Sequence, residues 1–256
     1  MTTPLKSLTG KVALITGGSR GIGRAIAQRL AKDGATVIIN YSSSAADAET
    51  LIKDIVDQIK PDVRPLAIKA DVSKLDQCKA LVQQSLQAFG RVDILVLNAG
   101  ILPMEDLSQI TEESFDRTFG VNVKGPMFLT QLLAPQMSSN SRVIFFSTSL
   151  TGASTVMPNY ALYNSSKGAI EQLARVLAKD LGRRGINVNV VSPGPTATDM
   201  FYSGKTEEQV KFIANLSPFG RLGTPKEIAG VVAFLAGPDS AWVSGQNIKA
   251  NGAFVV

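Results

Sequence analysis

The sequence has 256 residues, 45% of them hydrophobic, and this length and apolar content favour one large α/β domain over two. It contains no histidine and a single cysteine, which excludes a Ser-His-Asp triad, an intrachain disulfide and a multi-cysteine metal cluster, and we expect no metal site. The net charge is +5, but the basic residues are scattered, so we expect no nucleic-acid partner. With no long apolar run and no secretory signal, we also expect a cytoplasmic protein without a membrane partner.

Apolar, β-branched runs alternate with amphipathic stretches along the chain. Such alternation requires right-handed crossovers and a parallel sheet covered on both faces, which explains strands that are apolar almost throughout. The sequence therefore predicts a single-domain, Rossmann-like, doubly wound α/β fold over residues 1–256, with a seven-stranded parallel sheet and helices on both faces. Residues 199–218 break the alternation and are expected to form a substrate lid. We expect strands at 11–16, 35–41, 64–70, 92–98, 142–148, 186–191 and 246–251, and helices at 21–33, 45–60, 74–89, 111–137, 160–183 and 225–237.

A glycine-rich turn, Thr16-Gly17-Gly18-Ser19-Arg20-Gly21-Ile22-Gly23, joins the first strand to the first helix. Glycine permits left-handed backbone conformations and the close approach of a pyrophosphate, which free N–H groups and the positive end of the helix dipole then attract. A Walker lysine is absent, so a dinucleotide fits. A turn that serves only strand-to-helix packing is the alternative, but the agreement of strand, turn and helix favours dinucleotide binding.

The end of the second strand distinguishes the two nicotinamide dinucleotides. An acidic residue there would bind the ribose 2′-hydroxyl of NAD, but the strand ends Ile39-Asn40-Tyr41-Ser42-Ser43. Arg20 offers a planar cation for a 2′-phosphate, assisted by Ser42 or Ser43, and we expect NADP(H) to be preferred over NAD(H). A surface ion pair is the alternative for Arg20. Asp71, after the third strand, either accepts a hydrogen bond from the adenine amino group or caps the next helix.

Tyr163 and Lys167 lie four residues apart in a predicted helix and therefore share one of its faces. An unperturbed tyrosine has a pKa near 10, and we expect Lys167 and an oxidised nicotinamide to lower it, so that Tyr163 exchanges protons in place of the missing histidine. Such a pair is common on amphipathic helices, so its function depends on the residues around it.

Further polar residues are expected beside this pair. Ser149 follows the fifth strand, at the sheet edge where α/β folds bind ligands, and its hydroxyl is expected to hold a carbonyl oxygen beside the tyrosine. Ser147 and Thr148 compete for that role. Asn122 lies in an otherwise apolar helix and either anchors a water that relays protons to the lysine or is a satisfied buried amide.

The motifs occur in a fixed order, namely the turn at 16–23, Asn98-Ala99-Gly100, Asn122, Ser149, Tyr163-x-x-x-Lys167, Pro193-Gly194 and Arg221-x-Gly223-x-Pro225-x-Glu227. Over nearly the whole chain this set resembles the single-domain short-chain dehydrogenase/reductase family. The resemblance implies that Tyr163 is the acid/base, that Ser149 orients the substrate, that Lys167 holds the nicotinamide ribose and that Asn122 positions a relay water. It also assigns residues 98–100 to the sheet and the cofactor wall, residues 193–198 to the nicotinamide carboxamide and the pyrophosphate, and Ile22 to packing beside the nicotinamide.

The chain departs from the family pattern at three places. The interval of fourteen residues from Ser149 to Tyr163 is one longer than is common, Leu97 replaces a frequent asparagine, and residues 251–253 read Asn-Gly-Ala in place of Asp-Gly-Gly. The longer interval resembles that of naphthol reductases acting on polyketide ketones, whereas the N-terminal turn resembles that of 3-oxoacyl reductases, so the substrate stays open. The apolar side chains that either line a substrate pocket or cover the core are Met157, Tyr160, Met200, Phe201 and Tyr202.

We therefore expect an NADPH-dependent carbonyl reductase or alcohol dehydrogenase that transfers a hydride between nicotinamide and a small-molecule ketone or secondary alcohol. A non-catalytic NADP-binding sensor or scaffold is one alternative, and a lyase or epimerase of similar fold is another. Helices 111–137 and 160–183 resemble the dimer-forming pair of the family, which implies a homotetramer or a homodimer. The expected catalytic residues are Ser149, Tyr163, Lys167 and Asn122, and the expected cofactor-binding residues are Gly17, Ser19, Arg20, Gly21, Ile22, Gly23, Asn40, Tyr41, Ser42, Asp71, Val72, Asn98, Ala99, Gly100, Tyr163, Lys167, Pro193, Gly194, Thr196 and Thr198.

Overall fold

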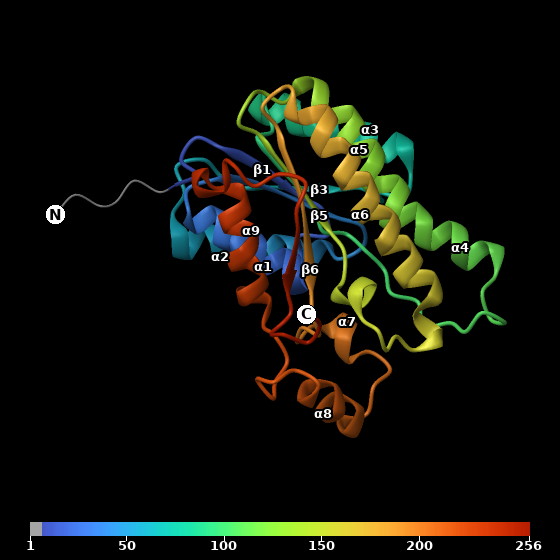
Figure 1. Ribbon diagram of the computed structural model, residues 1–256. Helices are drawn as coiled ribbons and strands as arrows, with labels where there is room; N and C mark the ends of the chain where they lie inside the picture. Colours follow the sequence, from blue (N-terminus) through green and yellow to red (C-terminus); the bar gives the residue numbers. More distant parts are fainter. Residues whose placement is uncertain (1–6) are drawn as a thin grey trace.

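The computed structural model describes residues 7–256, so the first six residues of the predicted domain lie outside the described part. Seven parallel strands form one sheet in the order β3-β2-β1-β4-β5-β6-β7, with helices on both faces (Figure 1). The prediction of a Rossmann-like, doubly wound α/β fold is confirmed. The strands are β1 (Val12–Ile15), β2 (Thr36–Tyr41), β3 (Leu66–Lys69), β4 (Ile94–Leu97), β5 (Arg142–Phe146), β6 (Asn187–Pro193) and β7 (Asn247–Ala250).

Two helical layers cover strands whose side chains are apolar on both faces. Leu14 and Ile15 of β1 are both fully buried but belong to different cores, because successive side chains of a strand point to opposite faces. Within residues 7–256, none of the helices is both long and apolar enough to cross a membrane. One face of the sheet carries α1 (Gly21–Lys32), α2 (Ala45–Ile59) and α9 (Pro225–Ala236), and the other carries α3 (Leu75–Phe89), α5 (Gly125–Leu133) and α6 (Ala161–Gly182) (Figure 1).

The helix predicted over residues 111–137 is confirmed as one helical stretch, Glu112 to Gln136, but it is not regular throughout. α4 (Glu112–Phe119) passes into a π-helical turn (Gly120–Lys124) before α5 begins. Pro126 favours this irregular turn, because it has no N–H to donate to the carbonyl oxygen of Asn122 four residues earlier. Turns of this kind are frequent at functional sites, and this one carries Asn122.

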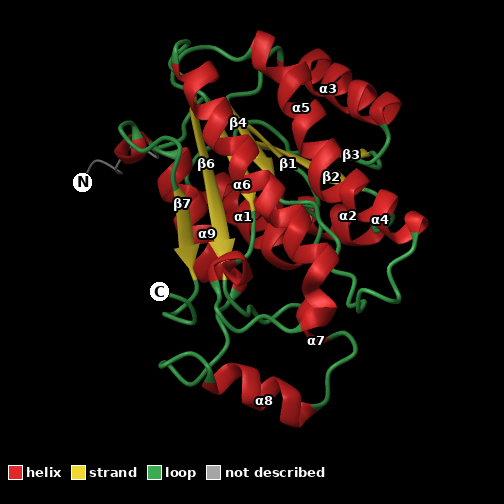
Figure 2. Ribbon diagram, turned by 45° about the vertical axis from the view of Figure 1, so that its right-hand side comes forward, coloured by secondary structure: helices red, strands yellow, loops and turns green. Residues whose placement is uncertain are grey.

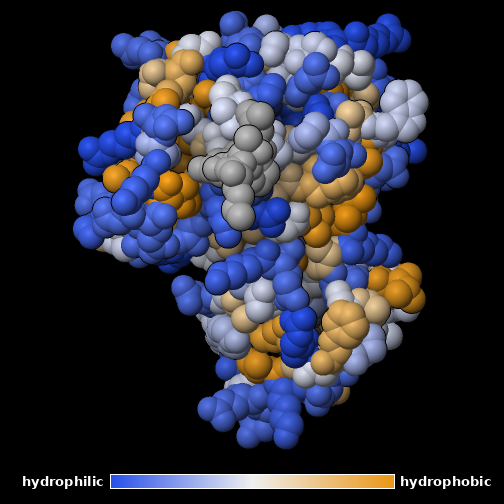
Figure 3. All heavy atoms as spheres, turned by 90° about the vertical axis from the view of Figure 1, so that its left-hand side faces the viewer, coloured by the Kyte–Doolittle hydropathy of each residue, from blue (hydrophilic) through white to orange (hydrophobic). Residues whose placement is uncertain are grey.

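The segment that breaks the alternation lies beyond the carboxyl ends of the strands. Residues 199–218 contain α7 (Asp199–Tyr202) and α8 (Glu207–Asn215), toward which the arrows of β6 and β7 point in Figure 2. A threonine begins each of these helices by accepting a backbone hydrogen bond. Figure 3 shows apolar atoms on this projecting part, which carries the exposed side chains of Phe212 and Leu216.

Candidate active site

The strand order reverses between β1 and β4, and the glycine-rich turn lies there, at the carboxyl edge of the sheet. Gly17 and Gly21 have φ angles of 60° and 55°, a left-handed conformation that favours glycine. A Cβ on Gly23 would lie 2.2 Å from the carbonyl oxygen of Gly17, so a larger residue would push α1 away from the turn. α1 has no side-chain cap and no acidic residue in its first turn, so its N–H groups and positive dipole end fit a pyrophosphate.

Two asparagines hold the glycine-rich turn in place. Asn98 donates from Nδ2 to the carbonyl oxygens of Thr16 (2.9 Å) and Gly17 (3.1 Å). The side chain of Asn40 is buried, accepts from the N–H of Gly17 (3.4 Å) and donates to the carbonyl oxygen of Ala70 (3.0 Å). Asn40 therefore supports the turn from within the core.

The residues expected around the 2′-phosphate lie at the surface. Arg20 and Ser42 are exposed, and Arg20 forms no ion pair within the described part of the chain, so the ion-pair alternative is not observed. Asp71 accepts through Oδ1 from both the N–H (2.9 Å) and the hydroxyl (2.8 Å) of Ser73. These bonds close a turn before α3, whose N-cap is Lys74, so the prediction that Asp71 could cap this helix was wrong.

The loop after β6 approaches the glycine-rich turn. A Cβ on Gly21 would lie 3.5 Å from Cγ2 of Thr198, so the two segments meet across the carboxyl edge. Thr196 is buried and donates from Oγ1 to the carbonyl oxygen of Gly194 (2.8 Å), which fixes the loop. The other predicted cofactor residues at this edge of the sheet are Ser19, Ile22, Tyr41, Val72, Ala99, Gly100 and Pro193.

The first turns of α6 carry Tyr163 and Lys167. Lys167 is 5% exposed and donates from Nζ to the carbonyl oxygen of Phe146 (2.9 Å). Its Nζ lies 5.8 Å from the centre of the Tyr163 ring. Burial lowers the pKa of Lys167 to about 8, because the ammonium loses contact with water.

The pKa of Tyr163 shifts in the direction opposite to the expected one. Burial raises this pKa to about 12, and a hydrogen bond with the Thr148 side chain opposes the change. The lowering expected from Lys167 is not observed, and the Lys167 ammonium donates instead to the carbonyl oxygen of Phe146. Tyr163 is therefore a neutral phenol at physiological pH, which is the form that a general acid requires.

Three hydroxyls after β5 are candidates for the place beside Tyr163, and their hydrogen-bond partners distinguish them. Ser147 donates to a carboxylate oxygen of Glu171 (2.6 Å) and is therefore engaged elsewhere. Thr148 contacts the tyrosine itself. Ser149 is 1% exposed, and its Oγ has no hydrogen-bond partner within the described residues. A buried hydroxyl without a partner costs free energy, so Ser149 is the hydroxyl best able to bind a substrate oxygen.

Asn122 is a buried amide with both hydrogens engaged. Nδ2 donates to the carbonyl oxygen of Ile101 (3.0 Å) and to Oγ of Ser166 (3.0 Å), and Oδ1 accepts from the N–H of Ile101 (2.9 Å). The side chain of Asn122 is thus a buried amide with its hydrogen bonds made, which is one of the two alternatives expected for it. Its Oδ1 still has one lone pair that accepts no hydrogen bond from the described residues. A Cβ on Gly100 would lie 3.3 Å from Oδ1 of Asn122 and 3.4 Å from Nζ of Lys167, so Gly100 adjoins both groups.

Glu171 belongs to this site, although the motifs did not single it out. Its Oε1 accepts from the hydroxyls of Ser147 and Thr151, which lie on either side of Ser149 in the chain. The signal in the sequence was its position four residues after Lys167, which continues the spacing that begins at Tyr163.

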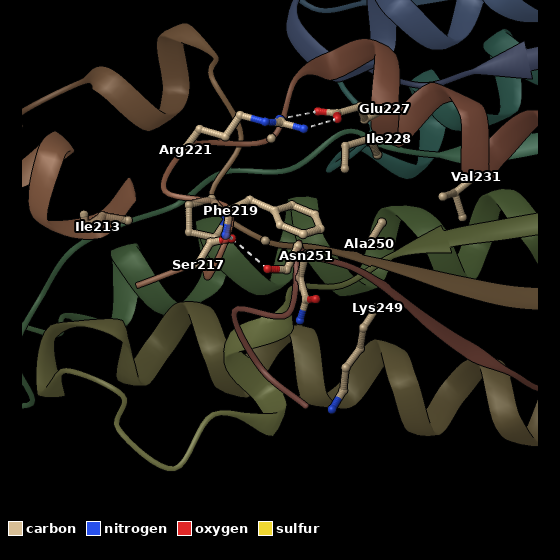
Figure 4. A pocket seen from close by; sticks show the side chains of 14 residues that line it. Ile213, Ser217, Phe219, Arg221, Glu227, Ile228, Val231, Lys249, Ala250 and Asn251 are labelled. Atoms are coloured by element: carbon tan, nitrogen blue, oxygen red, sulfur yellow. Dashed lines mark hydrogen bonds and ion pairs between the residues drawn. The ribbon is translucent and has the colours of Figure 1, made fainter. Parts of the chain in front are cut away.

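A cavity of about 300 Å³ lies behind the loop that follows β6 (Figure 4). Its walls come from the segment after α8, from α9 and from β7, and the ion pair between Arg221 and Glu227 (2.7 Å) lies on one side. Of the predicted site residues, Gly194 lines this cavity. Neither Tyr163 nor the glycine-rich turn lines it.

Known proteins resemble the chain along almost its whole length. A family model described as enoyl-(acyl carrier protein) reductase matches residues 17–254. The hydroxynaphthalene reductase-like protein Arp2 of Metarhizium majus is 41% identical over 262 residues, covering 98% of this chain and 97% of that protein. A short-chain dehydrogenase/reductase from Serratia marcescens superposes with a TM-score of 0.92 at 36% identity, covering 98% of this chain and 100% of the other. A short chain dehydrogenase from Burkholderia cenocepacia in complex with NADP gives a TM-score of 0.90 at 35% identity, covering 97% and 99%.

Proposed function

Because the chain belongs to the short-chain dehydrogenase/reductase family and is an oxidoreductase, we propose that it reduces the carbonyl group of a small-molecule ketone with NADPH. In the reverse direction it oxidises the corresponding secondary alcohol. The observation that carries this proposal is the neutral, partly buried phenol of Tyr163, which lies on the same helix as Lys167 and follows the unpaired hydroxyl of Ser149 in the motif order.

The roles of the side chains follow from their protonation states and contacts. A bound reduced nicotinamide supplies the hydride. Tyr163 donates its proton to the substrate oxygen as negative charge develops there, and Ser149 donates a hydrogen bond to the same oxygen. Lys167 holds the nicotinamide ribose, and its charge stabilises the phenolate left on Tyr163. Asn122 accepts from a water through the free lone pair of Oδ1, and this water returns a proton toward Lys167.

We expect Ser149→Ala to lower kcat for ketone reduction by about 10²- to 10³-fold, because the developing oxyanion loses an aligned donor. Steady-state kinetics with NADPH and a ketone measure the change. Ser154→Ala, which removes an exposed hydroxyl from the same loop, is the matched control and should leave kcat unchanged. Equal kcat values for Ser149→Ala and the wild type would exclude Ser149 from the reaction.

NADP(H) is the preferred cofactor in this proposal. The end of β2 offers Tyr41 and Ser42 in place of an acidic residue, and the exposed guanidinium of Arg20 is free to engage a 2′-phosphate. The NADP bound to the Burkholderia cenocepacia protein supports the same choice.

Replacement of Arg20 tests the cofactor preference. We expect Arg20→Ala to raise the Kd of NADPH by about 10- to 100-fold, because a charge-assisted contact to the 2′-phosphate contributes roughly 1.5–3 kcal/mol. The Kd of NADH should change by less than about twofold, since NADH has no 2′-phosphate. Fluorescence titration of both cofactors measures the effect, with Arg183→Ala as a control at another exposed arginine. Equal weakening of both cofactors would contradict the assignment.

Residues 199–218 act as a substrate lid on one dinucleotide-binding and catalytic domain. Met200 and Tyr202 of α7 are 51% and 47% exposed, and the rings of Phe201 and Tyr202 meet edge to face with centres 5.5 Å apart. Together with the exposed Met157, these side chains favour an apolar ketone as substrate.

Exposed apolar side chains on two parts of the molecule support assembly into a homotetramer. Phe115 of α4, Met127 of α5 and Val176 of α6 are exposed on one side of the sheet. Phe234 of α9 and Trp242 are exposed elsewhere on the molecule. Self-complementary pairing at both surfaces gives dihedral symmetry, whereas pairing at one gives a homodimer. The cytoplasmic location stays a prediction from the sequence.

A further inference from the structure

We propose that Glu171 is a positioning residue that holds the loop carrying Ser149 against helix α6. This inference rests on the proposed function, because the purpose of the contact is to keep the Ser149 hydroxyl beside the phenol of Tyr163. α6 contributes both Tyr163 and Glu171. A contact from Glu171 to the serine loop therefore fixes the positions of both Ser149, the hydrogen-bond donor, and Tyr163, the acid, relative to the same helix.

One carboxylate oxygen of Glu171 accepts two short hydrogen bonds. Oε1 lies 2.6 Å from Oγ of Ser147 and 2.5 Å from Oγ1 of Thr151, distances typical of charge-assisted O–H···O⁻ bonds. Each hydroxyl also has a second acceptor, the carbonyl oxygen of Lys167 at 3.4 Å from Ser147 and that of Thr148 at 2.8 Å from Thr151. Each hydroxyl has one hydrogen, and the carboxylate oxygen is nearer and charged, so both hydrogens point to Glu171.

The two hydroxyls that bind Glu171 flank Ser149 symmetrically in the chain. Ser147 lies two residues before it and also donates its N–H to the carbonyl oxygen of Val191 (2.9 Å). Thr151 lies two residues after it, in the 3₁₀ turn Ser149–Gly152. Because the hydroxyl of Ser149 has no hydrogen bond of its own within the described residues, the fixed residues on either side set its position.

This contact is also compatible with the longer interval between Ser149 and Tyr163. The intervening residues include exposed positions and a 3₁₀ turn, Pro158–Tyr160, directly before α6. Glu171 joins the serine loop to α6 by a route that does not pass through this connection. An added residue in the connection therefore need not displace Ser149.

Hydrogen exchange tests the contact without requiring turnover. In Glu171→Ala, the peptide that contains the Leu150 and Thr151 amides should exchange at least about tenfold faster than in the wild type, because the loop loses its anchor on α6. Glu171→Gln should exchange like the wild type, since its amide oxygen still accepts from both hydroxyls. Asp180→Ala removes an exposed carboxylate from the same helix and should also leave the rate unchanged. An unchanged rate in Glu171→Ala would overturn the proposal.

Kinetic coupling tests whether Glu171 acts through Ser149. Glu171→Ala should lower kcat by roughly 10- to 100-fold, with the Kd of NADPH unchanged and with activity restored in Glu171→Gln. In a Ser149→Ala background the same substitution should change kcat by less than about twofold, because the group it positions is gone. Equal losses in both backgrounds would assign Glu171 to general stability and reject the positioning role. Absence of turnover in the wild type, with the exchange results as expected, would contradict the proposed function alone.

Discussion

The variant Tyr163→Phe is expected to lose about 10³-fold in kcat for NADPH-dependent ketone reduction while binding NADPH as tightly as the wild type. The phenol donates the proton, whereas the glycine-rich turn and α1 hold the phosphates. The substitution should therefore slow the reaction without changing the affinity for NADPH. Steady-state turnover and fluorescence titration of NADPH measure the two quantities. Tyr160→Phe removes a phenolic hydroxyl from the neighbouring ring, 6.5 Å away between centres, and should keep kcat within about threefold of the wild type. A Tyr163→Phe enzyme with substantial turnover would refute the assigned acid.

Lys167→Met is expected to lower turnover by at least about 10²-fold and, at neutral pH, to make the cofactor-free protein more stable. Turnover falls because the phenolate of Tyr163 and the nicotinamide ribose lose their cation. Stability rises because burial has shifted the pKa of Lys167 from 10.5 to about 8, which at about 1.4 kcal/mol per unit corresponds to roughly 3 kcal/mol. The lost hydrogen bond to Phe146 offsets about 1 kcal/mol of this gain. Chemical denaturation and kinetics of the same preparations measure both effects.

The stability gained in Lys167→Met should depend on pH with a defined sign. The folded pKa of about 8 lies below the unfolded value of 10.5, so the folded protein binds fewer protons between these values. The unfavourable contribution of Lys167 is therefore complete below pH 8 and disappears as the pH rises toward 10.5. The two proteins should converge in free energy of unfolding over that range. Lys179→Met, at an exposed position of α6, should change stability by less than about 0.5 kcal/mol at any pH. A stability difference that stays constant with pH would contradict this account.

Much of the fold was predictable because its physical cause is local. Strands buried on both faces read as continuous apolar runs, so β1, with Leu14 and Ile15 in opposite cores, was visible in the sequence. The π-helical turn at Gly120–Lys124 was missed because apolar periodicity continues through it. Pro126 carried the available signal, since a proline cannot complete the helical hydrogen bond to Asn122.

The candidate site was less predictable, because its properties depend on contacts between distant segments. The direction of the Tyr163 pKa shift depends on burial, which the hydrogen bond with Thr148 only partly opposes, and neither effect follows from the spacing of two residues on a helix. The local role of Asp71 depends on Ser73, whose N–H and hydroxyl both donate to the Asp71 carboxylate. Glu171 acts on hydroxyls twenty or more residues away in the chain. Such partners become visible only when the fold brings them together.

NADPH oxidation by the purified protein, followed through the absorbance of the reduced nicotinamide with a panel of ketones, tests whether the protein is a ketone reductase. The panel includes 3-oxoacyl thioesters, aromatic polyketide ketones and sugars, and Tyr163→Phe is assayed in parallel. We expect ketone-dependent oxidation that is faster with NADPH than with NADH and is lost in Tyr163→Phe. Binding of NADPH without its oxidation in the presence of any ketone would contradict the proposed reductase function and favour a sensor or scaffold.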